Sequence, residues 1–228
     1  GTAEAGSRVT SYDGTTTLGT AIANSSGAWT FTTSVLTQGS HPISVSVTDA
    51  AGNVSGRTNA TVVIDTTPPA AVTLVAANNN GSTAVTIPNN GVTNDSTPLL
   101  SGTGEVGAKV SIYDGAALLG TTTVASNGTW SFISTTLSNG SHTLNVTQTD
   151  AAGNISPNAS TVMTIDTVAP NAVTNLVITD DVGATQGPLA NGAVTDDATP
   201  TLSGTAEANA IVTIYDGNTV VGSTTASA

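Results

Sequence analysis

The sequence contains no cysteine among its 228 residues, so no disulfide bond can stabilise its fold. It is also poor in basic residues, with three Lys and Arg against fifteen Asp and Glu, which gives a net charge of −12. This negative charge repels phosphate groups and excludes nucleic acid as a partner. No apolar run is long enough to cross a membrane, and the N-terminus lacks the charged and apolar regions of a signal peptide. We therefore expect a soluble internal segment of a longer protein.

One motif recurs at a spacing of about a hundred residues. The three copies read GTAEAGSRVTSYDG, SGTGEVGAKVSIYDG and SGTAEANAIVTIYDG. Their equivalent glycines are Gly1, Gly102 and Gly204, so the offsets are 102 − 1 = 101 and 204 − 102 = 102 residues. Such a period suits a whole domain, because one turn of a solenoid is much shorter. The sequence predicts the later part of a unit, one complete unit and the earlier part of another, at residues 1–66, 67–167 and 168–228.

Short alternating runs bounded by turn residues fill the chain, and no segment has a helical period, which is typical of an all-β fold. In the complete unit we expect strands at Ala71–Ala77, Ala84–Ile87, Thr97–Gly102, Lys109–Tyr113, Leu118–Val124, Thr129–Ser134, Ser141–Thr149 and Thr161–Ile165. This number of strands in a hundred residues predicts an immunoglobulin-like β-sandwich. The fold class is therefore all-β, with tandem immunoglobulin-like β-sandwiches, one complete and two partial.

Two aromatic residues lie two positions apart on one predicted strand, where they share a face. They are Trp130 and Phe132, and Trp29 and Phe31 occupy the equivalent positions one repeat earlier. A carbohydrate-stacking pair is one interpretation of this pattern. Recurrence on the same face of the same strand favours the other interpretation, in which these rings fill the core.

The acidic residues recur at fixed positions of the repeat. Equivalent sets are Glu4, Glu105 and Glu207; Asp13, Asp114 and Asp216; Asp49 and Asp150; Asp65 and Asp166; and Asp95 and Asp197. The other three, Asp180, Asp181 and Asp196, correspond to Asn78, Asn79 and Asn94. A surface that merely confers solubility would also carry lysine, and its charged residues would not occupy the same positions in each repeat. Fixed carboxylates with Asn as the alternative indicate oxygen ligands for a hard cation.

Signals for catalysis are absent. Gly102, Gly104 and Gly107 spell GxGxxG, but no helix is predicted after them, which excludes a dinucleotide site. His41 and His142 lie at the start of a predicted strand with no triad around them. Asp114 precedes Gly115 in what reads as a simple turn. We expect no enzymatic activity.

The chain resembles the bacterial immunoglobulin-like repeats of giant surface adhesins and biofilm-associated proteins. The resemblance rests on IDTTPP and IDTVAP, TPLLSGTGE and TPTLSGTAE, NGTWSF, and VTDAAGN and QTDAAGN, and it spans the whole chain. It implies export by type I secretion, an extracellular place on the bacterial cell surface, and Ca²⁺ bound at and near domain junctions. The proline-containing joints Asp65–Pro69 and Asp166–Pro170 are then short and semi-rigid.

Strand direction in such a sandwich brings Asp65, Glu105 and Asp150 to the end where the chain enters the complete unit. Three carboxylates there predict a Ca²⁺ site, although Asp150 could instead cap its own loop. The next junction holds Asp166 and Glu207, an incomplete set. The opposite end of the third unit holds four carboxylates that repel one another without a counter-ion, so a cation is a candidate there: Asp180, Asp181, Asp196 and Asp197.

Two functions fit these observations. One is a structural spacer, whose partners are the neighbouring repeats of its own chain while other regions contact a host-cell or biofilm-matrix ligand. The alternative is a glycan- or matrix-binding module that is itself adhesive. Near-identical repeats without a patch special to one of them favour the spacer. Because 1–66 and 168–228 are partial, we also expect unpaired sheet edges, so that the chain either associates end to end or frays at both ends.

Overall fold

The computed structural model describes residues 1–228, which form strands, turns and loops. The chain divides into two compact units, Gly1–Asp166 and Thr167–Ala228. Strands pair in antiparallel fashion except at one short parallel pair in the first unit. No helix in the structure has the length and apolar character that crossing a membrane requires. The predicted all-β class is confirmed, whereas the division into 1–66, 67–167 and 168–228 stays a prediction.

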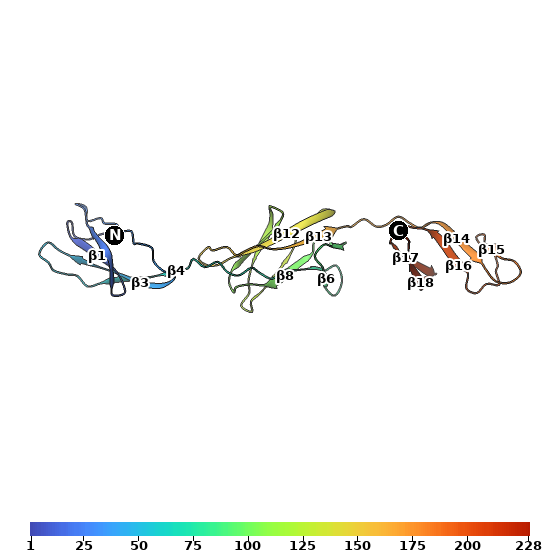
Figure 1. Ribbon diagram of the computed structural model, residues 1–228, viewed down its shortest axis with the longest axis horizontal. Coiled ribbons are helices and arrows are strands. Elements are labelled where there is room, and N and C mark those ends of the chain that lie inside the picture. The colour runs from blue at the N-terminus through green and yellow to red at the C-terminus, as the bar shows by residue number, and fades with distance from the viewer. The chain divides into compact units, whose positions relative to one another are not determined.

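The middle repeat is a sandwich of two sheets. One sheet has the strand order β10-β9-β12-β13-β7 and the other β11-β8-β5-β6, and Figure 1 shows β12 and β13 on one side of the repeat with β8 and β6 on the other. The strands are β5 (Val75–Asn78), β6 (Val85–Ile87), β7 (Gly91–Thr93), β8 (Leu99–Thr103), β9 (Lys109–Asp114), β10 (Ala117–Thr123), β11 (Thr129–Ile133), β12 (Gly140–Thr149) and β13 (Ala159–Ile165).

The core of this repeat follows from alternation along the central strands. Val110 and Ile112 on β9 are fully buried, as are Leu144 and Val146 on β12, because every second side chain faces the opposite sheet. Leu100 on β8 meets them from the other layer in the same cluster. Trp130 is also buried, as the core interpretation requires. Each fully buried aliphatic side chain contributes roughly 1.5–3 kcal/mol.

Two features of the middle repeat differ from the prediction. The first strand begins at Val75 and not at Ala71, although the amide of Thr73 already donates to the carbonyl of Thr103 at 3.0 Å. Strand β7 was not predicted at all, since Gly91 to Thr93 follow an Asn-rich turn and their partner β13 lies some seventy residues away.

The close packing of the recurring Ser-Gly motif is clear at Gly102, where a Cβ atom would overlap the carbonyl oxygen of Thr73.

The first repeat forms one sheet of order β2-β1-β3-β4. Its strands are β1 (Arg8–Asp13), β2 (Thr16–Ile22), β3 (Gly39–Thr48) and β4 (Thr58–Ile64). The segment equivalent to β11 is not a strand, and only an isolated bridge joins Thr2 to Ala28 at its start. Trp29 and Phe31 on this segment are only half-buried, although Trp29 exchanges backbone hydrogen bonds with Gly1, the equivalent of Gly102 on β8. The structure thus shows a single four-stranded sheet in the first repeat.

The second compact unit, called the third unit below because it follows the first and middle repeats in sequence, contains a sheet of order β15-β14-β16 and a hairpin of β17 and β18. Its strands are β14 (Thr174–Asp180), β15 (Gly187–Pro188), β16 (Thr201–Thr205), β17 (Ile211–Asp216) and β18 (Thr219–Thr225). Leu202 is 39% exposed and Ile178 37%, whereas their equivalents in the middle repeat, Leu100 and Ala76, are 0% and 2% exposed. These side chains are thus only partly covered in this unit.

Candidate functional site

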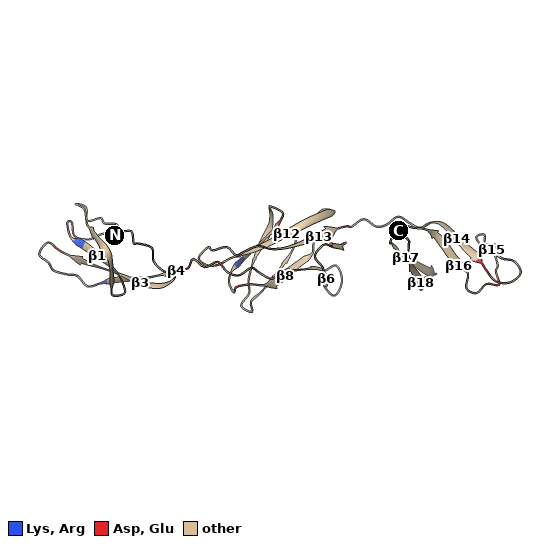
Figure 2. Ribbon diagram, in the orientation of Figure 1, with Lys and Arg blue, Asp and Glu red and all other residues tan.

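Acidic residues lie in loops and at strand ends, while the three basic residues are isolated (Figure 2). Strands β1, β9 and β17 each end on an aspartate, and β14 ends on Asp180. Within these strands, apolar and hydroxyl residues alternate. The charged residues therefore lie where the strands end. The loops are therefore where any cation or polar network must be sought.

The joint between the first and middle repeats is held by a side-chain amide. Asn154 donates from Nδ2 to the backbone carbonyl of Asp65 at 3.1 Å. The same amide donates to Oδ2 of Asp150 at 2.9 Å. Asp65 follows directly on β4 of the first repeat, and Asn154 lies in a loop of the middle repeat. A single side chain thus links two consecutive repeats.

Asp150 acts as the cap of its own loop. Its Oδ1 accepts hydrogen bonds from the backbone amides of Ala152 and Asn154, both at 2.9 Å. The side-chain hydrogen bond from Asn154 is the largest influence on this carboxyl and, with the backbone donors, holds its pKa below the usual value. Asp49 and Asn53 repeat the arrangement in the first repeat, with amide-to-Oδ2 distance 2.7 Å. The capping role that the sequence left open for Asp150 is thus present.

Gln148 fixes the entry of the chain into the middle repeat. It is 2% exposed, its Nε2 donates to the carbonyl of Ala70 at 2.7 Å, and its Oε1 accepts the backbone amide of Glu105 at 2.9 Å. Sequence analysis missed both Gln148 and Asn154. Asn154 could have been found, because it recurs at Asn53 within the repeated DAAGN motif, whereas the equivalent of Gln148 is Val47.

The structure brings the loops of Asp65, Glu105 and Asp150 to one end of the middle repeat without gathering their carboxylates. No group of three or more such side chains is close enough to hold a metal ion. Asp65 accepts at Oδ1 from Gln38 and from the amide of Thr67, and Glu105 is exposed. The chemistry of this set, oxygen donors alone, fits Ca²⁺. A cation there would require the exposed Asp65 and Glu105 side chains to turn towards Asp150, so this site stays a prediction.

The second predicted junction pair falls in separate compact units. Asp166 ends the first unit, where its amide donates to the carbonyl of Thr93 at 2.9 Å. Glu207 lies in the second unit, exposed, and its carbonyl accepts the amide of Ala210 at 3.0 Å. Neither backbone contact involves the carboxylates that the prediction assigns to a cation. The pair stays a prediction.

Of the four acids in the long loop of the third unit, Asp197 is the one that accepts backbone amides from both sides of the loop. Asp197 is 5% exposed and accepts the amides of Thr199 at 2.7 Å and Asp181 at 3.3 Å. Asp95 does the same in the middle repeat, where it is fully buried and accepts from Thr97 and Asn79. These two aspartates close their loops through backbone hydrogen bonds, which a buried carboxylate needs for compensation.

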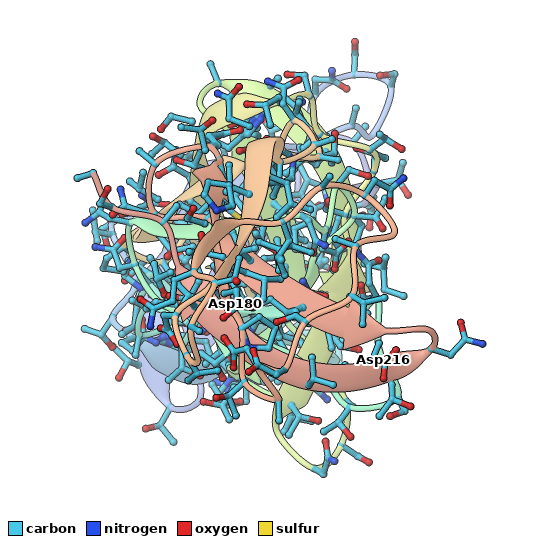
Figure 3. The ribbon with its side chains drawn as sticks, turned by 90° about the vertical axis from the view of Figure 1, so that its right-hand side faces the viewer. Asp180 and Asp216 are labelled. Carbon is cyan, nitrogen blue, oxygen red and sulfur yellow. The ribbon has the colours of Figure 1, made fainter.

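A second position in this loop changes character between repeats. In the middle repeat Asn78 donates from Nδ2 to Oδ1 of Asn94 at 3.0 Å. In the third unit both partners are aspartates, Asp180 and Asp196, and both line one hollow in the loop. Asp180 is 5% exposed and accepts from Thr195 Oγ1 at 2.6 Å. Figure 3 shows it among the loops, away from Asp216 at the end of the β17–β18 hairpin.

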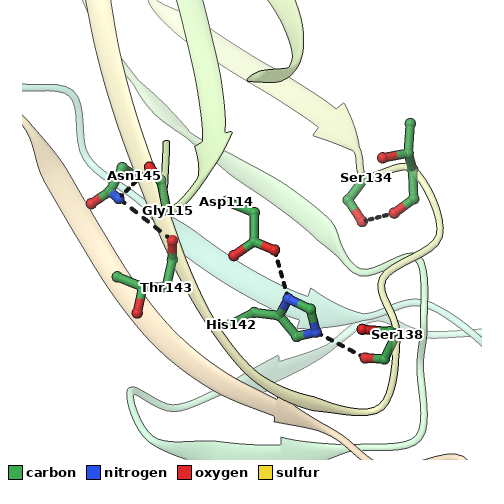
Figure 4. Close-up of polar contacts among 8 residues, drawn as sticks. Asp114, Gly115, Ser134, Ser138, His142, Thr143 and Asn145 are labelled. Carbon is green, nitrogen blue, oxygen red and sulfur yellow. Dashed lines mark hydrogen bonds and ion pairs between the residues drawn. The ribbon is translucent and has the colours of Figure 1, made fainter. Parts of the chain in front are cut away.

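Sequence analysis gave the histidines no role, and Asp114, which it interpreted as a turn residue, lies beside one of them. His142 lies with Nδ1 2.7 Å from Oδ2 of Asp114 and Nε2 2.8 Å from the carbonyl oxygen of Ser138 (Figure 4). His41 has the same arrangement with Asp13 and Thr37 in the first repeat. The available signal was a histidine and an aspartate that recur together, 28 residues apart.

These features define a class of protein: tandem immunoglobulin-like β-sandwiches with acidic loops. A family model described as "Bacterial Ig-like domain" matches residues 1–66 and 67–167. The chain belongs to this family, which is non-catalytic. No curated protein sequence matches it.

One solved structure that matches is titled "Biofilm associated protein - BSP domain". Its identity to this chain is 22%, and the TM-score is 0.32. The alignment covers 72% of this chain and 25% of that one, so the present sequence spans about a quarter of that structure's length.

Proposed function

We propose that this chain is a structural spacer segment of a bacterial surface protein, which sets the distance between the cell and an adhesive region elsewhere. The observation that supports this best is the joint between the first two repeats. Asn154 of the middle repeat hydrogen-bonds the carbonyl of Asp65 at 3.1 Å, and Gln148 fixes Ala70 just beyond the prolines. A joint fixed by side chains on both sides of Pro68 and Pro69 restrains the orientation of one repeat relative to the next, as a spacer requires.

The proposed setting is extracellular, on the bacterial cell surface, in cell adhesion or biofilm formation. Membership of the bacterial Ig-like family supports this setting. The net charge of −12 keeps a long array soluble and disfavours non-specific association with nucleic acid or anionic lipid. The partners of the segment are then the neighbouring repeats of its own chain, and a host-cell or matrix ligand binds other regions.

Calcium would stiffen such an array. Asp65, Glu105 and Asp150 would hold the ion at the first joint, Asp166 and Glu207 would contribute at the next, and the loop acids of the third unit would hold another. Bound Ca²⁺ would neutralise like charges and cross-link a loop to the preceding joint. The amide of Asn154 contributes without any ion, because it already links Asp65 to Asp150.

The experiment that tests the spacer proposal is binding of the 228-residue chain to a glycan array and to immobilised host matrix proteins, in millimolar Ca²⁺. A spacer gives no specific signal. Trp130, 3% exposed, is not available for stacking on a sugar. Saturable binding to one glycan or matrix protein, lost on thermal unfolding, would instead establish the adhesive-module alternative.

A further inference from the structure

Each of the first two repeats holds an imidazole ring between two hydrogen-bond acceptors. In the middle repeat His142 Nδ1 lies 2.7 Å from the Asp114 carboxylate and Nε2 lies 2.8 Å from the Ser138 carbonyl oxygen (Figure 4). A carbonyl oxygen and an ionised carboxylate only accept, so both ring nitrogens must donate. A neutral imidazole carries one N–H and satisfies one of these contacts. The geometry therefore suits the imidazolium ion.

The first repeat contains the same arrangement. His41 Nδ1 lies 2.6 Å from Asp13 and Nε2 lies 2.8 Å from the carbonyl of Thr37. The two histidine side chains are 9% and 10% exposed. The geometry is kept although the segment before Thr37 has no strand partner in this repeat. The arrangement, which we call the Asp–His clasp, is thus built locally from two adjacent strands and the loop before the second.

In the middle repeat the clasp fixes a loop that joins the two sheets. The amide of Ser134 donates to the carbonyl of Pro98 at 3.1 Å, and that of Leu137 donates to Ser96 at 2.8 Å. Both acceptors lie in the segment that leads into β8, and the Leu137 side chain is buried in the core. At the other end of the loop, the Ser138 carbonyl accepts from His142 on β12. The clasp therefore ties the connection between sheets to the β9–β12 pair.

We propose that the Asp–His clasp is a proton-controlled lock in each repeat, closed when the histidine is an imidazolium ion and opened when that ion loses a proton to solvent. Deprotonation leaves one N–H, which stays on Nδ1 because the Asp114 carboxylate is the charged acceptor. The Nε2 lone pair then faces the lone pairs of the Ser138 carbonyl, and the loop loses this attachment. A repeat with an open lock has a looser connection between its two sheets.

The charges around the clasp are few. Asp114 is the one ionisable group that acts on His142, since β13, β10 and the loop 134–139 carry none. In the first repeat Arg57 also lies at this corner, where it covers the Tyr12 ring at 3.6 Å and donates to Gly14 at 3.0 Å. Asn158 replaces it in the middle repeat, which is therefore the simpler case to test.

The balance of effects favours the charged ring in both repeats. For His41 the hydrogen bond that Nδ1–H donates to Asp13, followed by the one that Nε2–H donates to the Thr37 carbonyl, raises the pKa. For His142 burial opposes the charge, but the contacts with Asp114 and Ser138 outweigh it and the pKa is also raised. A raised pKa gives stability that is complete below the ordinary histidine value of about 6.5. That stability is lost as the pH rises through the raised pKa.

The test is an NMR titration of the imidazole signals in the 228-residue chain, which has two histidines. We expect both to titrate above about 6.5. Asp114→Asn should bring His142 down to or below that value while His41, with Asp13 intact, stays where it was and serves as the internal control. The exchange protection of the Leu137 amide should fall through the same pH range, about tenfold for each unit by which the pKa is raised.

A second variant separates the lock from simple packing. Gln at position 142 can donate to Ser138 but cannot titrate near neutral pH, so in His142→Gln the Leu137 protection factor should not change with pH. This comparison decides the matter even if Asp114→Asn fails to fold. The proposal is overturned if wild-type His142 titrates at or below the ordinary histidine pKa of about 6.5. It is also overturned if the Leu137 amide is equally protected from exchange at pH values below and above the His142 titration.

Discussion

The side-chain amide of Asn154 donates a hydrogen bond to the backbone carbonyl of Asp65 across 89 residues of sequence, and this contact joins two repeats. Because the acceptor is a backbone carbonyl, the contact does not depend on the charge of Asp65. It is exposed, so solvent competes for both groups and the contribution lies at the low end of about 0.5–1.5 kcal/mol. Its importance is orientational, since it connects the end of β4 to a loop of the next repeat.

Removing this amide should loosen the joint. In Asn154→Ala we expect the first two repeats to tumble more independently, measured as a larger difference between their NMR relaxation rates. Asn53→Ala is the matched control, because the Asn53 side chain bonds Asp49 in its own loop and reaches no joint. Equal relaxation behaviour in the two variants would show that Asn154 does not restrain the joint.

Calcium should stabilise the joint at Asp65–Pro69. Extracellular modules bind Ca²⁺ with dissociation constants of about 10⁻⁴–10⁻³ M. At ten times that constant, mass action adds about 1.4 kcal/mol. We expect a higher melting temperature and larger dimensions in X-ray scattering in millimolar Ca²⁺ than in EDTA.

The matched pair for calcium is Asp150→Asn and Asp49→Asn. Both variants weaken the same loop cap, but Asp150 alone lies at a joint within this chain. Asp150→Asn should blunt the response to Ca²⁺ and Asp49→Asn should leave it intact. If wild type behaves identically in EDTA and in Ca²⁺, the proposed role of calcium is wrong.

The long loop of the third unit should be more stable with Asn at positions 180 and 196 when no cation is present, and this advantage should disappear when a cation is bound. The double change Asp180→Asn and Asp196→Asn restores the amide pair that Asn78 and Asn94 form at 3.0 Å in the middle repeat. In EDTA we expect this variant to protect the loop better from hydrogen exchange, by about 0.5–1.5 kcal/mol for one hydrogen bond gained. In Ca²⁺ the difference should shrink or reverse. The prediction is contradicted if, in EDTA, the loop amides of the wild type are as well protected from hydrogen exchange as those of the variant.

Truncation of two equivalent leucines should lower the free energy of unfolding by different amounts. Leu100 is fully buried, so Leu100→Ala should cost about 2–5 kcal/mol. Leu202, at the same position of the third unit, is 39% exposed, and Leu202→Ala should cost a small fraction of that. Hydrogen exchange measured peptide by peptide assigns each loss to its own unit. Similar losses would mean that the face of β16 is covered in solution.

The uncovered face of the third unit should make this chain self-associate. Leu176, 62% exposed, and Leu202 lie on the β14–β16 sheet and line one apolar hollow. Size-exclusion chromatography with light scattering should show a mass that rises with concentration. Changing both leucines to Asn should restore a constant monomer mass, whereas Val35→Asn, at an exposed loop residue of the first repeat, should not. A wild-type chain that is monomeric at all concentrations would refute this.

Much of the fold could be predicted from the sequence because local patterns carry it. The alternation at Val110 and Ile112 involves residues two places apart, and the recurring motif and the repeated Trp130 position are visible when the sequence is compared with itself. The middle repeat has the expected order of strands along the chain for this reason. The short parallel strand β7 was missed because its pairing with β13 joins distant segments, and three residues after a turn have no alternation to detect.

The roles of the acidic residues were decided by the tertiary structure. The sequence alone determined that Asp95, Asp150 and their equivalents occupy fixed places, but whether a carboxylate binds a cation, a backbone amide or a histidine depends on what lies opposite it. Asp95 turned out to close a loop, Asp150 to cap one, and Asp114 to hold His142 across 28 residues. Strand register sets each of these partners, because it brings together groups that are remote along the chain.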